Sequence, residues 1–144
     1  MIQQSEISFQ VRATGSDLYL SVVLDGVQID KIQPTAEDQT ISLQINDDVA
    51  AEHCLALIMT GKHMDHTRID EQGKIMEDRV IEITDVRMDG IELGYVFTQT
   101  AQYTHDHNGT SESVTQPFYG IMGCNGCVEF GFTTPVYRWL LENM

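Results

Sequence analysis

Residues 53–97, HCLALIMTGKHMDHTRIDEQGKIMEDRVIEITDVRMDGIELGYVF, decide the fold of this chain. The segment starts with an apolar run at residues 54–59, in which both alternating faces are hydrophobic. Such a run is typical of a strand that is covered on both faces. A polar excursion over residues 61–79 follows, and a second strand begins near Val80. We therefore expect two core strands joined by an excursion that carries His and Asp.

The inward-facing residues of the second strand change phase. Ile81 and Ile83 alternate regularly, but the next apolar residues, Val86 and Met88, come one position late. One extra residue in a strand produces such a slip. The sequence therefore predicts a β-bulge near residues 84–85.

Further strands lie on both sides of this segment. Alternating apolar and polar residues predict strands at residues 7–13, 18–24, 41–45 and 128–132. Residues 27–32 follow a hairpin turn and are expected to form the second strand of that hairpin. Asp–Gly pairs at residues 25–26 and 89–90 predict tight hairpin turns. About eight short strands are typical of a two-sheet sandwich. We expect one all-β domain over residues 1–144, a jelly-roll-like two-sheet β-sandwich with a short C-terminal helix.

The C-terminal helix has its own signal. Thr134 is a good N-cap residue and Pro135 suits the first helical position. Val136, Trp139 and Leu140 then follow at helical spacing. We expect Trp139 to anchor this helix on the sheet.

Composition limits the function. The formal net charge is -14, with only 8 Lys and Arg residues, and these are scattered. Phosphate-backbone binding needs clustered positive charge, so no nucleic-acid partner is expected. No apolar run approaches the ~20 residues that span a bilayer, and the N-terminus has no secretion-signal pattern. We expect neither a membrane partner nor a disulfide framework.

Two polar runs could hold a metal ion. Histidine with carboxylates suits zinc, whereas Asp, Asn and carbonyl oxygens suit calcium. The candidate ligands are His63, Asp65, His66, His105, Asp106 and Asn108. Neither run matches a specific metal motif. The alternative is that these residues are solvated or form turns, in which case the chain has no cofactor.

The cysteines allow several interpretations. Cys124 and Cys127 have the spacing of redox or zinc sites, but the pair precedes a strand, and Cys54 lies in a core-like run. A turn with two free thiols and a local disulfide both remain open. His53 and Cys54 alternate to opposite faces of one strand, so they cannot act as base and nucleophile. We find no catalytic constellation and expect no enzyme activity.

An exposed aromatic ring would be needed to stack against a sugar. Tyr103 in the polar stretch and Tyr119 beside a glycine are the candidates for glycan or partner contact. Of the two, Tyr103 is expected to be the better platform for stacking against a sugar.

Three segments resemble small proteins of tailed bacteriophages: residues 61–97, YTHDHNGT at 103–110, and FYGIMGCNGCVEFGFTTPVYRWLLENM at 118–144. In the first half, ISFQVRATG, LYLSVVLDGVQID and LALIMTGK resemble jelly-roll modules of the xylan-binding type. The phage resemblance implies a non-enzymatic virion protein of the tail, neck, fibre or capsid decoration, assembled in the host cytoplasm.

Such a protein would contact other virion proteins, or copies of itself, through strand edges and the loops at residues 98–126. The second resemblance implies the alternative function, a carbohydrate-binding module for host or glycan adhesion, assisted by calcium. The chain lacks the Asp- and Asn-rich terminal loop of those modules.

Overall fold

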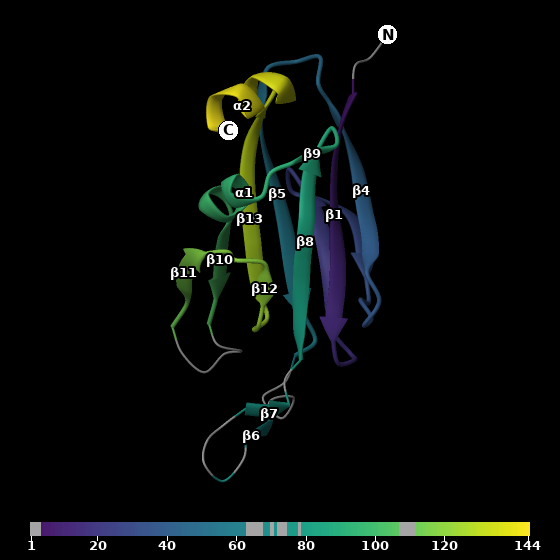
Figure 1. Cartoon of the computed structure of the whole chain (residues 1–144), viewed down its shortest axis with the longest axis vertical. Coiled ribbons are helices and arrows are strands. Elements are labelled where there is room, and N and C mark those ends of the chain that lie inside the picture. Colours follow the sequence, from purple (N-terminus) through teal and green to yellow (C-terminus); the bar gives the residue numbers. More distant parts are fainter. Residues whose placement is uncertain (1–3, 63–67, 70, 72–74, 78, 107–111) are drawn as a thin grey trace.

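Two antiparallel sheets face each other and form the body of the protein (Figure 1). The computed structural model describes residues 4–62, 68–69, 71, 75–77, 79–106 and 112–144. The strands are β1 (Gln4–Thr14), β2 (Tyr19–Leu24), β3 (Val27–Ile32), β4 (Gln39–Asn46), β5 (Ala51–Thr60), β6 (Arg68–Ile69), β7 (Ile75–Glu77), β8 (Val80–Met88), β9 (Ile91–Glu92), β10 (Gln102–His105), β11 (Val114–Pro117), β12 (Ile121–Met122) and β13 (Gly126–Thr134), and the helices are α1 (Tyr95–Thr100) and α2 (Val136–Asn143).

The strand order separates the two sheets cleanly. The first sheet runs β12-β8-β1-β4, and β9 pairs with β8. The second sheet runs β11-β10-β13-β5-β2-β3, while β6 and β7 pair with each other in a small two-stranded sheet. The predicted all-β two-sheet sandwich with a short C-terminal helix is therefore confirmed.

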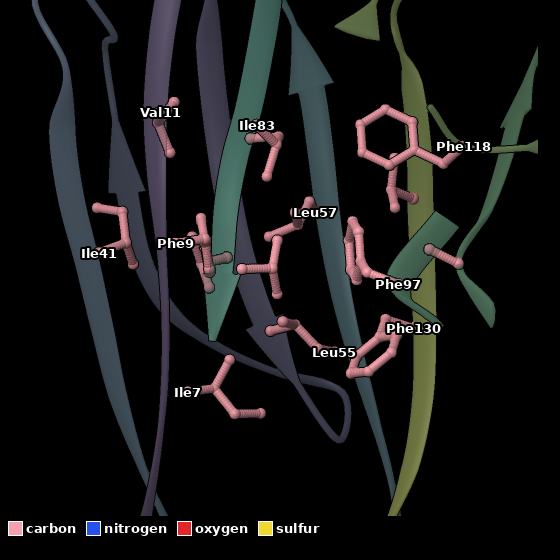
Figure 2. Packing of buried hydrophobic residues seen from close by; sticks show 14 of the residues in the cluster. Ile7, Phe9, Val11, Ile41, Leu55, Leu57, Ile83, Phe97, Phe118 and Phe130 are labelled. Atoms are coloured by element: carbon pink, nitrogen blue, oxygen red, sulfur yellow. The ribbon is translucent and has the colours of Figure 1, made fainter. Parts of the chain in front are cut away.

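The core lies between the inner faces of the sheets (Figure 2). The first sheet contributes Ile7, Phe9 and Val11 from β1, and the second contributes Leu55 and Leu57 from β5; all five are at most 2% exposed. Because side chains alternate along a strand, the polar residues between them face outward. This alternation is the pattern that the sequence showed.

An aromatic cluster fills the side of the core below the helices. Phe130 of β13 lies 5.1 Å from Phe97 of α1 and 5.6 Å from Trp139 of α2, measured between ring centres. Tilted and edge-on pairs of this kind add about 0.5–1.5 kcal/mol each to simple burial. Trp139 is buried and anchors α2, as predicted.

The central strand β5 departs from the prediction on one face. It lies between β13 and β2, in the middle of the second sheet. Its inward residues are buried, but Cys54, Ala56 and Ile58 on the outer face are only half-buried. The expectation that both faces are covered is wrong. The outer residues are apolar and partly shielded by their neighbours on the adjacent strands.

The bulge in β8 is where the phase slip placed it. Ser8 pairs with Arg87 and Gln10 pairs with Thr84, so two residues of β8 lie opposite one residue of β1. Asp85, within the bulge, has a φ of 54°. The extra residue returns Val86 and the following alternate residue to the core side.

The start of α2 differs from the prediction by one residue. Pro135 occupies the N-cap position and Val136 begins the helix. Thr134 does not cap the helix, because its hydroxyl donates to the carbonyl of Val49 at 2.6 Å. The cap acceptor is the carboxylate of Asp47 instead.

The segment at residues 98–126, which was expected to form loops, contains regular structure. Helix α1 ends at Thr100, and β10 and β11 then pair as a hairpin from Gln102↔Pro117 to His105↔Val114. This hairpin extends the second sheet beyond β13 and creates the edge on which the candidate site lies.

Candidate functional site

A groove of about 420 Å³ opens on the outer face of the second sheet, near the β10–β13 junction. We call it the β10–β13 groove. It is lined by Ile58, Met59, Thr104, His105, Asp106, Ser113, Asn125, Gly126, Cys127 and Glu129. Its polar side chains come from β10, from β13 and from residues that flank these strands and β11.

Strand register brings the lining residues together. Thr104 of β10 lies opposite Cys127 of β13, and Cys127 lies opposite Ile58 of β5. Residues in register across neighbouring strands share a face, so these three form a row across the sheet. Glu129 follows on the same face of β13, two residues after Cys127.

Gly126 allows β10 to approach β13 closely. A Cβ atom at this position would lie 2.4 Å from the carbonyl oxygen of Thr104 and 2.9 Å from the Cβ of His105. Both distances are below van der Waals contact. The floor of the groove at this junction therefore requires a residue without a side chain.

Tyr103 lies beneath the groove and does not line its surface. It is only 4% exposed, and its hydroxyl accepts from the backbone nitrogen of Cys124 at 2.9 Å and donates to the carbonyl of the same residue. Burial raises the pKa of Tyr103 to about 12, so the phenol stays neutral. The prediction that Tyr103 is an exposed platform is wrong. Its role is to fix the turn before β13.

A second set of hydrogen bonds holds the same turn from the other side. Asn125 accepts from the backbone nitrogen of Lys62 at 2.9 Å and donates to the carbonyl of Lys62 at 2.8 Å. The ammonium of Lys62 donates to the carbonyl of Gly123. Lys62 is 5% exposed, so these bonds are shielded from water. The turn is thus fastened to the end of β5 and presents a defined surface.

The chemistry of the groove is that of hydrogen bonding. Thr104 and Ser113 carry hydroxyls, and Asp106 and Glu129 carry carboxylates. Burial, together with the charge of Glu129, raises the pKa of the Cys127 thiol, so the thiol is protonated at neutral pH. A protonated, half-buried thiol is a poor nucleophile and a poor metal ligand. The groove can therefore bind polar ligands, but Cys127 does not supply an activated nucleophile there.

The predicted metal ligands are only partly placed. His105 and Asp106 line the groove, and His105 is 8% exposed. Residues His63, Asp65, His66 and Asn108 lie outside the described residues. Among the residues that the structure describes, no group of three His, Cys, Asp or Glu side chains could hold a metal ion. The described His, Cys, Asp and Glu side chains alone therefore do not form a metal site.

A chain of polar contacts lies at the other end of β5 and links His53 to Asp25 and Thr134. His53 Nδ1 lies 2.7 Å from Asp25, and Nε2 lies 3.2 Å from the hydroxyl of Thr134. That hydroxyl has one proton and directs it to the closer carbonyl of Val49. The contacts tie the β2–β3 hairpin to the end of β13.

Tyr119 lies on the first sheet, away from the groove. Its side chain is 77% exposed and borders a shallow hollow of about 270 Å³ with Glu82, Thr84 and Ile121. The predicted exposure of Tyr119 is confirmed. The two predicted aromatic contacts therefore do not belong to one site.

Sequence reasoning missed several lining residues. Glu129 alternates with buried Val128 and Phe130, so its outward direction was readable from the sequence. The placement of Asn125 and Ser113 depends on turns that the sequence does not define. No alternation pattern predicts which outward residues of separate strands share a groove.

The fold resembles that of known carbohydrate-binding modules. The structure of vCBM60 in complex with galactobiose matches with a TM-score of 0.51 and 13% identity over 88% of this chain and 97% of that chain. The selenomethionine form of vCBM60, described among calcium-dependent carbohydrate-binding modules, matches with a TM-score of 0.55 and 12% identity over 88% of this chain and 90% of that chain. At identities this low, the two matches show a shared fold and nothing more.

Other comparisons add no family. No protein-family model matches the chain, and neither does a curated protein sequence. Within the described part of the chain, neither helix is long and apolar enough to cross a bilayer.

Proposed function

We propose that the chain is a carbohydrate-binding module and that the β10–β13 groove is its saccharide site. The groove itself is the observation that carries the proposal. Its volume of about 420 Å³ lies within the range of about 300–1,000 Å³ for small-molecule sites. The sandwich shared with vCBM60, which binds galactobiose, supports the same function.

The lining residues suit the two surfaces of a sugar ring. Hydroxyls of a saccharide can donate to the carboxylates of Asp106 and Glu129 and can exchange hydrogen bonds with Thr104 and Ser113. The side chain of Ile58 supplies an apolar contact for ring C–H groups. Because Tyr103 is buried, this site would bind without an aromatic platform.

The charge of the protein limits the class of saccharide. With a formal net charge of -14 and two carboxylates in the groove, the site would repel uronic acids and sulfated sugars. Neutral hexose or pentose oligosaccharides are therefore the proposed ligands. The proposed contacts with the sugar do not involve calcium.

Isothermal titration with galactobiose and with xylan oligosaccharides tests the proposal. We expect binding with a dissociation constant of about 10 µM to 1 mM for at least one neutral sugar. Glu129→Ala should weaken it at least about tenfold, since hydrogen bonds to charged groups are worth about 1.5–3 kcal/mol. Glu37→Ala, an exposed glutamate outside the groove, is the matched control. Absence of binding both with calcium and with chelator would contradict the proposal.

The phage resemblance leads to a different function, a role on a virion, and this stays a prediction. Its physical basis would be contacts through open strand edges, which the fold provides independently of the groove.

A further inference from the structure

The sandwich has several sheet edges, and within the described part of the chain all but one are short, interrupted or charged. In the first sheet, β9 and β12 are each two residues long and share one edge of β8. Loop residues continue that edge, where Ile83 donates to Gly120 and Leu93 donates to Val86. This edge offers no free run of backbone.

The two edges of the second sheet carry other protections. Strand β11 has only four residues and ends in Pro117, which cannot donate to a ladder. Strand β3 contains Asp30 and Lys31, and its pairing with β2 shifts between Val22 and Val23. Charges, prolines and irregular pairing are the features by which natural proteins block edge-to-edge association.

Strand β4 has none of these protections. It spans Gln39–Asn46, eight residues with the sequence QTISLQIN, without charge or proline. It pairs with β1 in unbroken register from Gln4↔Asn46 to Val11↔Gln39. Among the described residues, no strand other than β1 pairs with it. About half of its backbone N–H and C=O groups therefore face an open edge. In Figure 1 this strand forms the outer border of the first sheet.

We propose that β4 is a dimerisation edge, at which a second copy of this chain adds its own β4 in antiparallel register. Strand addition of this type is driven by main-chain hydrogen bonds, and alternate side chains determine the register. A twofold axis makes the contact use the same strand of both copies, so the assembly closes at two chains.

The side chains of β4 are self-complementary in this arrangement. Residues directly opposite in an antiparallel pair must share a face of the sheet. At the twofold axis, a residue of one copy must therefore lie opposite the same residue of the other copy. With the axis at Ser42, Ile41 lies opposite Leu43 of the other copy on the core side. Thr40 then lies opposite Gln44 on the outer side. Every opposed pair within the strand is uncharged.

Charge at the ends of β4 gives the dimer a characteristic salt dependence. Glu37 and Asp38 precede the strand, and Asp48 follows it after the buried Asp47. In the antiparallel dimer the acidic ends of the two copies approach each other, and each copy carries a formal net charge of -14. Added salt screens this repulsion. Dimerisation should therefore strengthen as ionic strength rises, whereas binding of a basic peptide strand would weaken.

Sedimentation equilibrium of the full chain tests the proposal, at low and high salt and from about 1 µM to about 1 mM protein. We expect a reversible monomer–dimer equilibrium that tightens with salt. The variant Ser42→Lys/Gln44→Lys places lysines opposite each other across the dimer, whether the axis lies at Ser42 or at Leu43. It should weaken the dimer at least about tenfold. Both side chains are exposed, so the fold is retained, as circular dichroism would show.

The matched control is Gln28→Lys/Gln33→Lys, which adds the same charge at exposed positions outside β4 and should leave the equilibrium unchanged. Hydrogen exchange provides a readout that needs no variant: amides of β4 should be more protected at high protein concentration. A chain that sediments as a monomer throughout would overturn the proposal. So would a dimer that the β4 variant leaves intact or a dimer that salt dissociates.

Discussion

The carboxylate of Asp47 accepts a hydrogen bond from the backbone nitrogen of Val136 at 2.7 Å, across 89 positions of sequence. Asp47 is 6% exposed, so the bond is shielded from water. It satisfies an N–H group at the start of α2 that has no partner within the helix. The turn after β4 therefore holds the helix that carries Trp139 onto the core.

Replacing Asp47 with Ala should destabilise the fold by about 1–2 kcal/mol, the usual cost of losing an N-cap acceptor and burying an unsatisfied amide. Asp47→Asn keeps an oxygen acceptor and should cost less. Urea unfolding followed by Trp139 fluorescence measures both. Equal losses in the two variants would show that the carboxylate charge, and not the capping oxygen, is responsible.

Asp25 should make stability depend on pH. Partial burial raises its pKa, but the hydrogen bonds from His53 and from the backbone nitrogen of Cys54 outweigh this, so the pKa lies below its ordinary value. A carboxylate with a lowered folded pKa contributes stability above its unfolded pKa of about 3.9 and loses that contribution as pH falls through the folded pKa.

Asp25→Asn, which tolerates the positive φ of 50° at this turn, removes the charge of the carboxylate that accepts from His53. It should cost about 0.5 kcal/mol at pH 7, as for other partly exposed pairs. The cost should shrink as the pH falls through the lowered folded pKa of Asp25, because the aspartate then becomes uncharged like the asparagine. Unfolding curves at pH 7 and at a series of lower pH values provide the test, and a cost that does not change with pH would contradict the assignment.

Tyr103→Phe should destabilise the protein by about 1–3 kcal/mol, because it removes the hydroxyl that bonds the half-buried backbone amide and carbonyl of Cys124. The matched control is Tyr119→Phe, at an exposed tyrosine, which should change stability by less than about 0.5 kcal/mol. Denaturant midpoints distinguish the two. Similar small effects at both sites would mean that the Tyr103 hydroxyl does not hold the turn.

Gly126→Ala should separate β10 from β13, since its methyl group would overlap the carbonyl oxygen of Thr104. We expect a loss of about 2 kcal/mol or more and faster hydrogen exchange in β10. Gly131 in the same strand has 3.9 Å to the nearest atom, so Gly131→Ala should be neutral or slightly stabilising. If both alanines were tolerated equally, the close approach at Gly126 would not be structurally required.

The sequence predicted those features that depend on neighbouring residues. The phase slip at Val86 located the bulge, because alternation has a strict period of two. The two Asp–Gly pairs located turns whose residues have positive φ at Asp25 and Asp89. In both cases the deciding information lies within a few residues.

Features that depend on distant residues were not predictable. Tyr103 was expected on the surface because polar residues surround it, yet its ring is covered by the aromatic residue Phe118 and by His105. The cap from Asp47 and the groove beside Glu129 result from strand register between segments far apart in sequence. Register of this kind is determined by the assembled core.

The most direct test of the proposed saccharide site is a titration of the isotope-labelled chain with galactobiose or a xylan oligosaccharide, followed by NMR. If the sugar binds in the β10–β13 groove, the amide signals of Thr104, Cys127 and Glu129 will shift together and saturate with one affinity. Shifts confined to the hollow beside Tyr119, or no shift with any neutral sugar, would contradict it.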